Sequence, residues 1–122
     1  MQKICLTWRD ELIFIDLRLI AYFQANGNYT NLTYISGQKQ MLTIGLSKLE
    51  ESLRKRRPDG GISPFVRLGR SIIINQSYLY SISVPNQRLT LSDFEGHSHV
   101  ISVSKPILKR YKDLMSKDSS NR

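Results

Sequence analysis

Apolar residues at every second position, in short segments along most of the chain, are the feature that most restricts its fold. Near the start, Ile4, Leu6 and Trp8 alternate with residues such as Lys3 and Thr7. A spacing of two places the apolar side chains of a strand on one face, whereas a helix needs steps of three and four. The alternation therefore predicts a mainly β domain.

Asn26 and Gly27 predict a hairpin, because they separate two segments rich in β-branched and aromatic residues. These segments run over residues 20–25 and 29–35. The pair Asn-Gly suits a type I′ turn, in which both central residues need a positive φ. We therefore expect Asn26 and Gly27 at the centre of a tight turn between two paired strands.

Two short helices are predicted where the spacing of apolar residues changes to three and four. Leu46, Leu49 and Leu53 mark one face of the first helix. The second follows Ser104, and Pro106 is compatible with its first turn. The residues expected on its buried face are Ile107, Leu108, Tyr111, Leu114 and Met115.

The length of 122 residues suits one domain, which we place at residues 1–116, followed by a polar tail at residues 117–122. No apolar stretch reaches the roughly 18 residues that a membrane helix needs. Residues 1–9 lack the apolar core of a signal peptide, and Cys5 is the only cysteine. We therefore expect a cytoplasmic protein without a membrane partner.

Basic side chains outnumber acidic ones by 18 to 10, and the excess lies in one part of the chain. Residues 1–52 carry five of each sign, whereas residues 53–122 carry thirteen basic and five acidic side chains. A net charge of +8 attracts polyanions, nucleic acid first and an anionic membrane surface second. The alternative is that these side chains only keep the protein soluble.

Residues that would support catalysis or bind a cofactor do not form a recognisable pattern. His97 and His99 are the only histidines, and we expect them to face solvent or to be satisfied in the core. Tyr78 and Tyr80 alternate with apolar residues, which favours a core role over base stacking. The sequence therefore predicts a protein that is not an enzyme and needs no cofactor or metal.

Four polar or aromatic residues follow the predicted turn and suggest a DNA-reading strand. Asn28, Thr30 and Asn31 carry groups that pair with base edges, since asparagine binds adenine bidentately and threonine offers a hydroxyl and a methyl. Alternation places Asn28 and Thr30 on one face and Tyr29 and Asn31 on the other. We expect Asn28 and Thr30 to read bases and Tyr29 to support the fold. The alternative is an ordinary solvent-exposed strand face.

Two further stretches place cationic groups where local structure should fix them. Arg67 and Arg70 lie among apolar residues, and Gly69 between them permits a bend. An arginine at such a bend can fork onto guanine or phosphate. Ser104 and Lys105 begin the last helix, where free N–H groups and a lysine suit a phosphate. A simple helix cap by Ser104 is compatible with this role.

Three motifs in this order resemble the LytTR DNA-binding domain of bacterial transcription regulators. Residues 20–29 are similar to the pattern I-x-Y-h-E-x-x-G-x-Y, where h is hydrophobic. Residues 65–75 are similar to F-h-R-h-H-R-S-h-h-V-N, and residues 101–105 to h-x-V-S-R. The resemblance extends from about residue 3 to residue 115.

The resemblance implies an elongated fold of three small antiparallel sheets, whose loops and turns enter successive major grooves without a recognition helix. The residues that it places in the DNA-contacting loops are Asn28, Thr30 and Asn31, then Gly69, Arg70 and Ser71, and finally Lys105. The departures from the family pattern are Gln24 for glutamate, Gly69 for histidine and Lys105 for arginine.

The predicted function is sequence-specific binding of double-stranded DNA by a transcription regulator. The resemblance implies either the output domain of a two-component response regulator, with a receiver domain upstream, or a stand-alone regulator. It also implies direct repeats in the DNA and a DNA-assisted homodimer. The alternatives are an RNA-binding module and a basic interaction module that uses the helix at residues 105–112 to bind a protein or a membrane surface.

Overall fold

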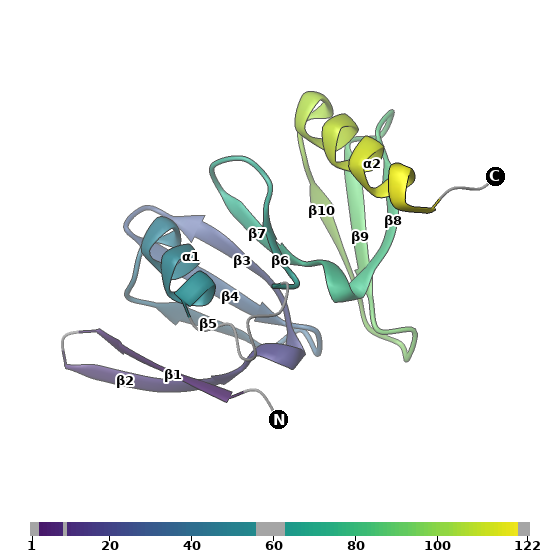
Figure 1. Ribbon diagram of the computed structural model, residues 1–122. Helices are drawn as coiled ribbons and strands as arrows, with labels where there is room; N and C mark the ends of the chain where they lie inside the picture. Colours follow the sequence, from purple (N-terminus) through teal and green to yellow (C-terminus); the bar gives the residue numbers. More distant parts are fainter. Residues whose placement is uncertain (1–2, 9, 56–62, 120–122) are drawn as a thin grey trace.

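Three small antiparallel sheets and two helices make up the computed structural model, which describes residues 3–8, 10–55 and 63–119 (Figure 1). The two-stranded sheet consists of β1 (Lys3–Trp8) and β2 (Glu11–Asp16). The five-stranded sheet has the order β5-β4-β3-β7-β6. Its strands are β3 (Ile20–Asn26), β4 (Tyr29–Tyr34), β5 (Lys39–Leu42), β6 (Phe65–Arg67) and β7 (Ile72–Asn75). The prediction of a mainly β fold with small antiparallel sheets is confirmed.

The third sheet has the order β10-β9-β8 and lies beside the five-stranded sheet in Figure 1. Its strands are β8 (Leu79–Ser83), β9 (Arg88–Ser92) and β10 (Ser98–Ser102). The helices are α1 (Leu46–Lys55) and α2 (Lys105–Ser119), and both predicted helices are therefore present. None of the helices in the described part of the chain is long and apolar enough to span a membrane.

The five-stranded sheet packs against other elements on both faces, which divides the apolar residues into two cores. Phe23 and Leu32 face the first core, together with Leu49 of α1 and residues of the β1–β2 hairpin. Ile72 and Ile74 face the second core, where the three-stranded sheet and α2 pack. Successive side chains of a strand point to opposite faces, so β7 contributes to both cores. This explains why residues 72–74 of β7 form an unbroken apolar run.

Buried polar groups fix the connection from β7 into the third sheet. The side chain of Asn75 is 2% exposed, and its Nδ2 donates a hydrogen bond to the carbonyl of Ile20 at 2.9 Å. Its Oδ1 accepts from the backbone N–H of Ser77 at 3.0 Å, at the start of a short 3₁₀ turn (Gln76–Tyr78). Asn75 therefore satisfies two backbone groups where the chain leaves the central sheet.

The β3–β4 turn differs by one residue from the predicted one. Asn26 pairs with Tyr29, so the two central residues are Gly27 and Asn28. Gly27 has a φ of +62°, whereas Asn28 is not among the described residues with a positive φ. Positive φ at the first central residue alone is the type II′ pattern, with glycine at that position. The predicted type I′ turn centred on Asn26 and Gly27 is therefore wrong.

The structure also corrects two expectations about burial. Leu114 is 57% exposed and lies outside the apolar stripe of α2, while Tyr80 is 58% exposed and lies outside the core. Helix α2 continues to Ser119, so the first residues of the predicted polar tail are helical. Tyr111 is buried as predicted, and its hydroxyl donates to Oε1 of Gln76 at 2.9 Å. Burial raises the pKa of Tyr111 to about 12.

Candidate nucleic-acid interface

The three predicted DNA-contacting stretches lie next to one another in the folded chain. The backbone N–H of Ala25 donates to the carbonyl of Ser71 at 2.8 Å, which joins the β3–β4 hairpin to the β6–β7 turn. A Cβ atom on Gly69 would lie 2.8 Å from Cδ1 of Ile107, so the first turn of α2 packs against the same turn. In Figure 1 the β3–β4 turn, the β6–β7 turn and the start of α2 follow the upper side of the molecule.

In the first stretch, Thr30 lies in the core and cannot read DNA bases. Its side chain is fully buried, and its hydroxyl donates to the carbonyl of Ile44 at 2.8 Å. Thr30 shares the face of Leu32, which is also fully buried. Tyr29, which we expected to support the fold, is 46% exposed. The assignment of the two faces was therefore reversed for Thr30 and Tyr29.

The exposed face of the same hairpin carries a different polar set. Asn31 is half-buried and lies directly opposite Gln24, which is exposed, and Tyr29 lies on the same face. Asn28 is exposed in the turn, as expected. Tyr29 and Gln24 were missed as candidates. Leu32, two residues after Thr30, was the signal that identifies the buried face.

Substitutions in this hairpin should separate the buried from the exposed face. Thr30→Val keeps the shape of the side chain but leaves the buried carbonyl of Ile44 without its donor, so we expect the free energy of unfolding to fall by about 1–3 kcal/mol. Tyr29→Ala should change it by less than about 0.5 kcal/mol, as for an exposed position. Chemical denaturation measures both. A stable Thr30→Val beside a strongly destabilised Tyr29→Ala would contradict this assignment.

In the second stretch, the guanidinium of Arg67 is bound by the protein itself. Its Nε donates to the carbonyl of Gly69 at 3.1 Å, and Nη2 donates to the carbonyl of Arg70 at 2.7 Å. Its Nη1 donates to Ser47 Oγ at 3.1 Å and to Glu50 Oε1 at 3.0 Å, both on α1. The side chain is only 22% exposed. Arg67 therefore braces the β6–β7 turn against α1, an internal role that its sequence context did not predict.

The β6–β7 turn presents three exposed residues, Gly69, Arg70 and Ser71. Gly69 has a φ of +82°, a conformation that costs other L-residues roughly 1–2 kcal/mol. The predicted bend at Gly69 is therefore present. Because Arg67 binds two successive carbonyls of this turn, those of Gly69 and Arg70, the Arg70 side chain starts from a fixed position.

The third stretch begins α2. The carbonyl of Ser104 accepts from the N–H of Leu108 at 2.9 Å, so Ser104 takes the cap position and Lys105 is the first helical residue. Both side chains are exposed, at the positive end of the helix dipole. Lys109 and Arg110 are exposed on the following turn and extend the basic surface.

A further basic residue, Arg88, lies near this helix start and was missed as a candidate. The N–H of Val103 donates to the carbonyl of Gln87 at 3.1 Å, and Arg88 pairs with Ser102 in the sheet. Arg88 is exposed. Its position beside the helix start depends on the pairing of β9 with β10, and local sequence offers no signal for it.

We call the following residues the polar edge: Asn28, Tyr29, Asn31, Gly69, Arg70, Ser71, Ser104 and Lys105. They come from the β3–β4 hairpin, the β6–β7 turn and the start of α2, and they include two cationic side chains. Arg70 can approach a base or a phosphate, and Lys105 suits a phosphate. None of the acidic residues is among them.

The two histidines interact with neighbouring protein groups. Nδ1 of His97 lies 2.6 Å from Oδ2 of Asp93, and Nε2 of His99 lies 3.0 Å from the carbonyl of Ile35. The backbone N–H of Glu95, with the contacts from His97, lowers the pKa of Asp93 below its usual value. Among the residues that the structure describes, no three His, Cys, Asp or Glu side chains gather as metal ligands would.

Comparisons with known proteins agree with this architecture. The model of the LytTr DNA-binding domain family matches residues 10–116. A similar solved structure is a LytTr DNA-binding domain from Bacillus cereus, with a TM-score of 0.59 and 20% sequence identity. The similarity covers 94% of this chain and 97% of that one, and at this identity it shows the shared fold. No curated protein matches the chain.

Proposed function

Because the chain belongs to the LytTR family of DNA-binding domains, we propose that it binds double-stranded DNA sequence-specifically through the polar edge, as part of a transcription regulator. The proposal rests on the observation that the three stretches contact one another. The Ala25–Ser71 hydrogen bond and the packing of Ile107 on Gly69 hold them on one side of the molecule. A continuous row of exposed polar turns can follow successive grooves of a duplex.

The residues of the polar edge have different roles in this proposal. Arg70 forks onto guanine in a major groove, where bidentate pairing distinguishes bases. Asn28 and Asn31 supply amide groups that match adenine. Ser104 and Lys105 bind a phosphate at the helix start, which positions the protein without reading sequence. Ser71 contributes a hydroxyl beside Arg70.

The proposed biological setting comes from the family. The chain acts as the output domain of a two-component response regulator, controlled by an upstream receiver domain, or as a stand-alone regulator in the cytoplasm. It binds direct repeats, and the duplex brings two copies together as a DNA-assisted homodimer. No enzymatic step is part of this proposal.

Selection of bound sequences from a pool of random duplex DNA tests the proposed function. We expect one enriched motif whose repeats lie on one face of the helix, and competition by single-stranded RNA that is much weaker than competition by the selected duplex. Preference for single-stranded RNA would instead support an RNA-binding module. Enrichment of no motif, with binding that depends only on duplex length, would contradict sequence-specific recognition.

Lys105→Ala should weaken binding to selected and unrelated duplexes by similar factors. A lysine at a helix start acts on phosphate as a point charge, so its loss should reduce the slope of log affinity against log salt by about 0.9. Titrations at several salt concentrations measure this slope. Lys117→Ala, at the opposite end of the same helix, is the control and should leave the slope unchanged. A loss confined to one sequence would contradict the phosphate role.

A further inference from the structure

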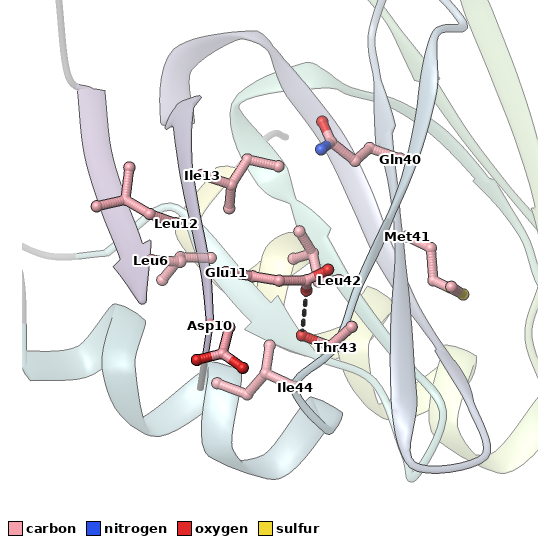
Figure 2. A pocket seen from close by; sticks show the side chains of 10 residues that line it. All are labelled: Leu6, Asp10, Glu11, Leu12, Ile13, Gln40, Met41, Leu42, Thr43 and Ile44. Carbon is pink, nitrogen blue, oxygen red and sulfur yellow. Dashed lines mark hydrogen bonds between the residues drawn. The ribbon is translucent and has the colours of Figure 1, made fainter. Parts of the chain in front are cut away.

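A cavity of about 420 Å³ lies between β2 and β5, and no residue of the polar edge lines it (Figure 2). Figure 2 shows Leu6, Ile13 and Leu42 converging in the space between the two strands. Leu6, Leu42 and Ile44 are each less than one tenth exposed, so they form an apolar floor. The volume is within the range of roughly 300–1,000 Å³ that is usual for ligand sites.

One wall of this cavity is the unpaired edge of β5. β5 is the last strand of the five-stranded sheet and pairs only with β4. The N–H of Tyr34 donates to the carbonyl of Gln38 at 2.8 Å, and Leu32 pairs with Gln40. Backbone groups in an antiparallel ladder alternate in direction, so the N–H and C=O of Met41 point away from β4. β5 can therefore accept another strand along the cavity.

The other wall is acidic in a chain whose net charge is +8. Asp10 and Glu11 line the cavity at the start of β2, and both are exposed. Oε1 of Glu11 accepts a hydrogen bond from Oγ1 of Thr43 at 2.6 Å, drawn as a dashed line in Figure 2. The carboxylate is thus held beside the free edge of β5. The charge of this wall complements a cationic side chain.

We propose that this cavity binds a short extended segment of a partner protein, which adds to the edge of β5 as a further strand. Addition to a sheet edge supplies main-chain hydrogen bonds, and pockets for alternate side chains supply specificity. Alternate residues of the added strand face the cavity, one over the apolar floor and the next beside Glu11. The segment therefore has the pattern apolar-x-basic, with lysine or arginine at the basic position. This inference goes beyond DNA binding, because it uses no residue of the polar edge.

Titration of the isotope-labelled chain with blocked heptapeptides tests the proposal by NMR. The probe has the sequence Ser-Thr-Val-Thr-Lys-Thr-Ser, and the matched control has glutamate in place of lysine. We expect saturable shifts of the backbone amides at residues 11–13 and 39–44 with the lysine peptide. The glutamate peptide should bind at least about tenfold more weakly, because its carboxylate would face Asp10 and Glu11. A lysine peptide with alternate amides N-methylated should not bind.

Two substitutions test the geometry. Met41→Pro removes the outward N–H, which β4 does not use, and proline is tolerated on the open side of an edge strand. Glu11→Gln removes the charge beside the cavity, and Glu51→Gln on α1 is its control. Met41→Pro and Glu11→Gln should each weaken peptide binding about tenfold or more, whereas Glu51→Gln should not. The affinity for duplex DNA should stay at the parent value in all three variants.

Several outcomes would overturn the proposal. These are the absence of saturable shifts at millimolar peptide, shifts centred on the polar edge, or equal affinity for the lysine and glutamate peptides. Concentration-dependent shifts of residues 39–44 without peptide would instead indicate that β5 pairs with a second copy of the chain. If Met41→Pro does not fold, Glu11→Gln and the N-methylated peptide still decide the question. If the chain did not bind DNA, the peptide-binding results would still test this proposal, because they use no residue of the polar edge.

Discussion

Arg67→Ala is expected to weaken specific DNA binding by about 100-fold or more, because ordering the three residues of the freed turn (69–71) on binding would cost roughly 1–2 kcal/mol for each of them. The guanidinium donates to two carbonyls of this turn and to two side chains of α1. The free energy of unfolding should also fall, by about 2–3 kcal/mol. The ion pair with Glu50 adds little, since that side chain is 36% exposed.

Fluorescence anisotropy with the selected duplex and chemical denaturation measure the two effects of Arg67→Ala. Glu50→Gln is the control, because an amide oxygen can still accept from Nη1 and the effect should be small. Loss of DNA binding without loss of stability would show that Arg67 contacts DNA directly. Unchanged DNA binding would refute its role as the brace of the turn.

Arg70→Ala should weaken binding to the selected duplex by about 1–3 kcal/mol and relax the preference at one base pair. Arg70 is exposed in the turn that Arg67 holds, so its removal should change the free energy of unfolding by less than about 0.5 kcal/mol. Arg70→Lys keeps the charge but loses the fork. Compared with Arg70→Ala, Arg70→Lys should therefore recover much of the affinity for unrelated duplexes but little of the base preference.

A repeat of the sequence selection with each Arg70 variant measures this preference. An Arg70→Ala protein that enriches the parent motif with parent affinity would show that the β6–β7 turn does not enter the DNA. A uniform loss on all duplexes, with the motif unchanged, would assign Arg70 to phosphate instead of base contact.

Local spacing was sufficient to predict the strands and both helices. The leucines at positions 46, 49 and 53 are buried on α1, and alternation at residues 20–25 and 29–35 corresponds to β3 and β4. Side-chain spacing follows directly from backbone geometry, which is why it can be read without the tertiary structure. The apolar run at residues 72–74 forms most of β7, which is buried on both faces.

The internal role of Arg67 could not be predicted from local sequence, because it depends on contacts distant in sequence. An arginine between apolar residues points off the apolar face in any strand, so Arg67 resembled a DNA-binding group. Its partners Ser47 and Glu50 are 20 and 17 residues away, on a helix that only the fold brings near. The prediction for Thr30 was wrong for a local reason. Alternation defines two faces of the strand but not which of them is buried, and the apolar residue Leu32, on the same face as Thr30, marks the buried one.

The most direct test of the proposed interface is an NMR map of backbone amides with and without the selected duplex. The structure predicts the largest shifts at residues 27–31, 69–71, 104, 105 and 107, because the β3–β4 turn, the β6–β7 turn and the start of α2 form one continuous edge. The outer strand β1 should show none. Large shifts confined to the β1–β2 hairpin or to the exposed face of β8, with the three stretches unchanged, would contradict DNA recognition through the polar edge.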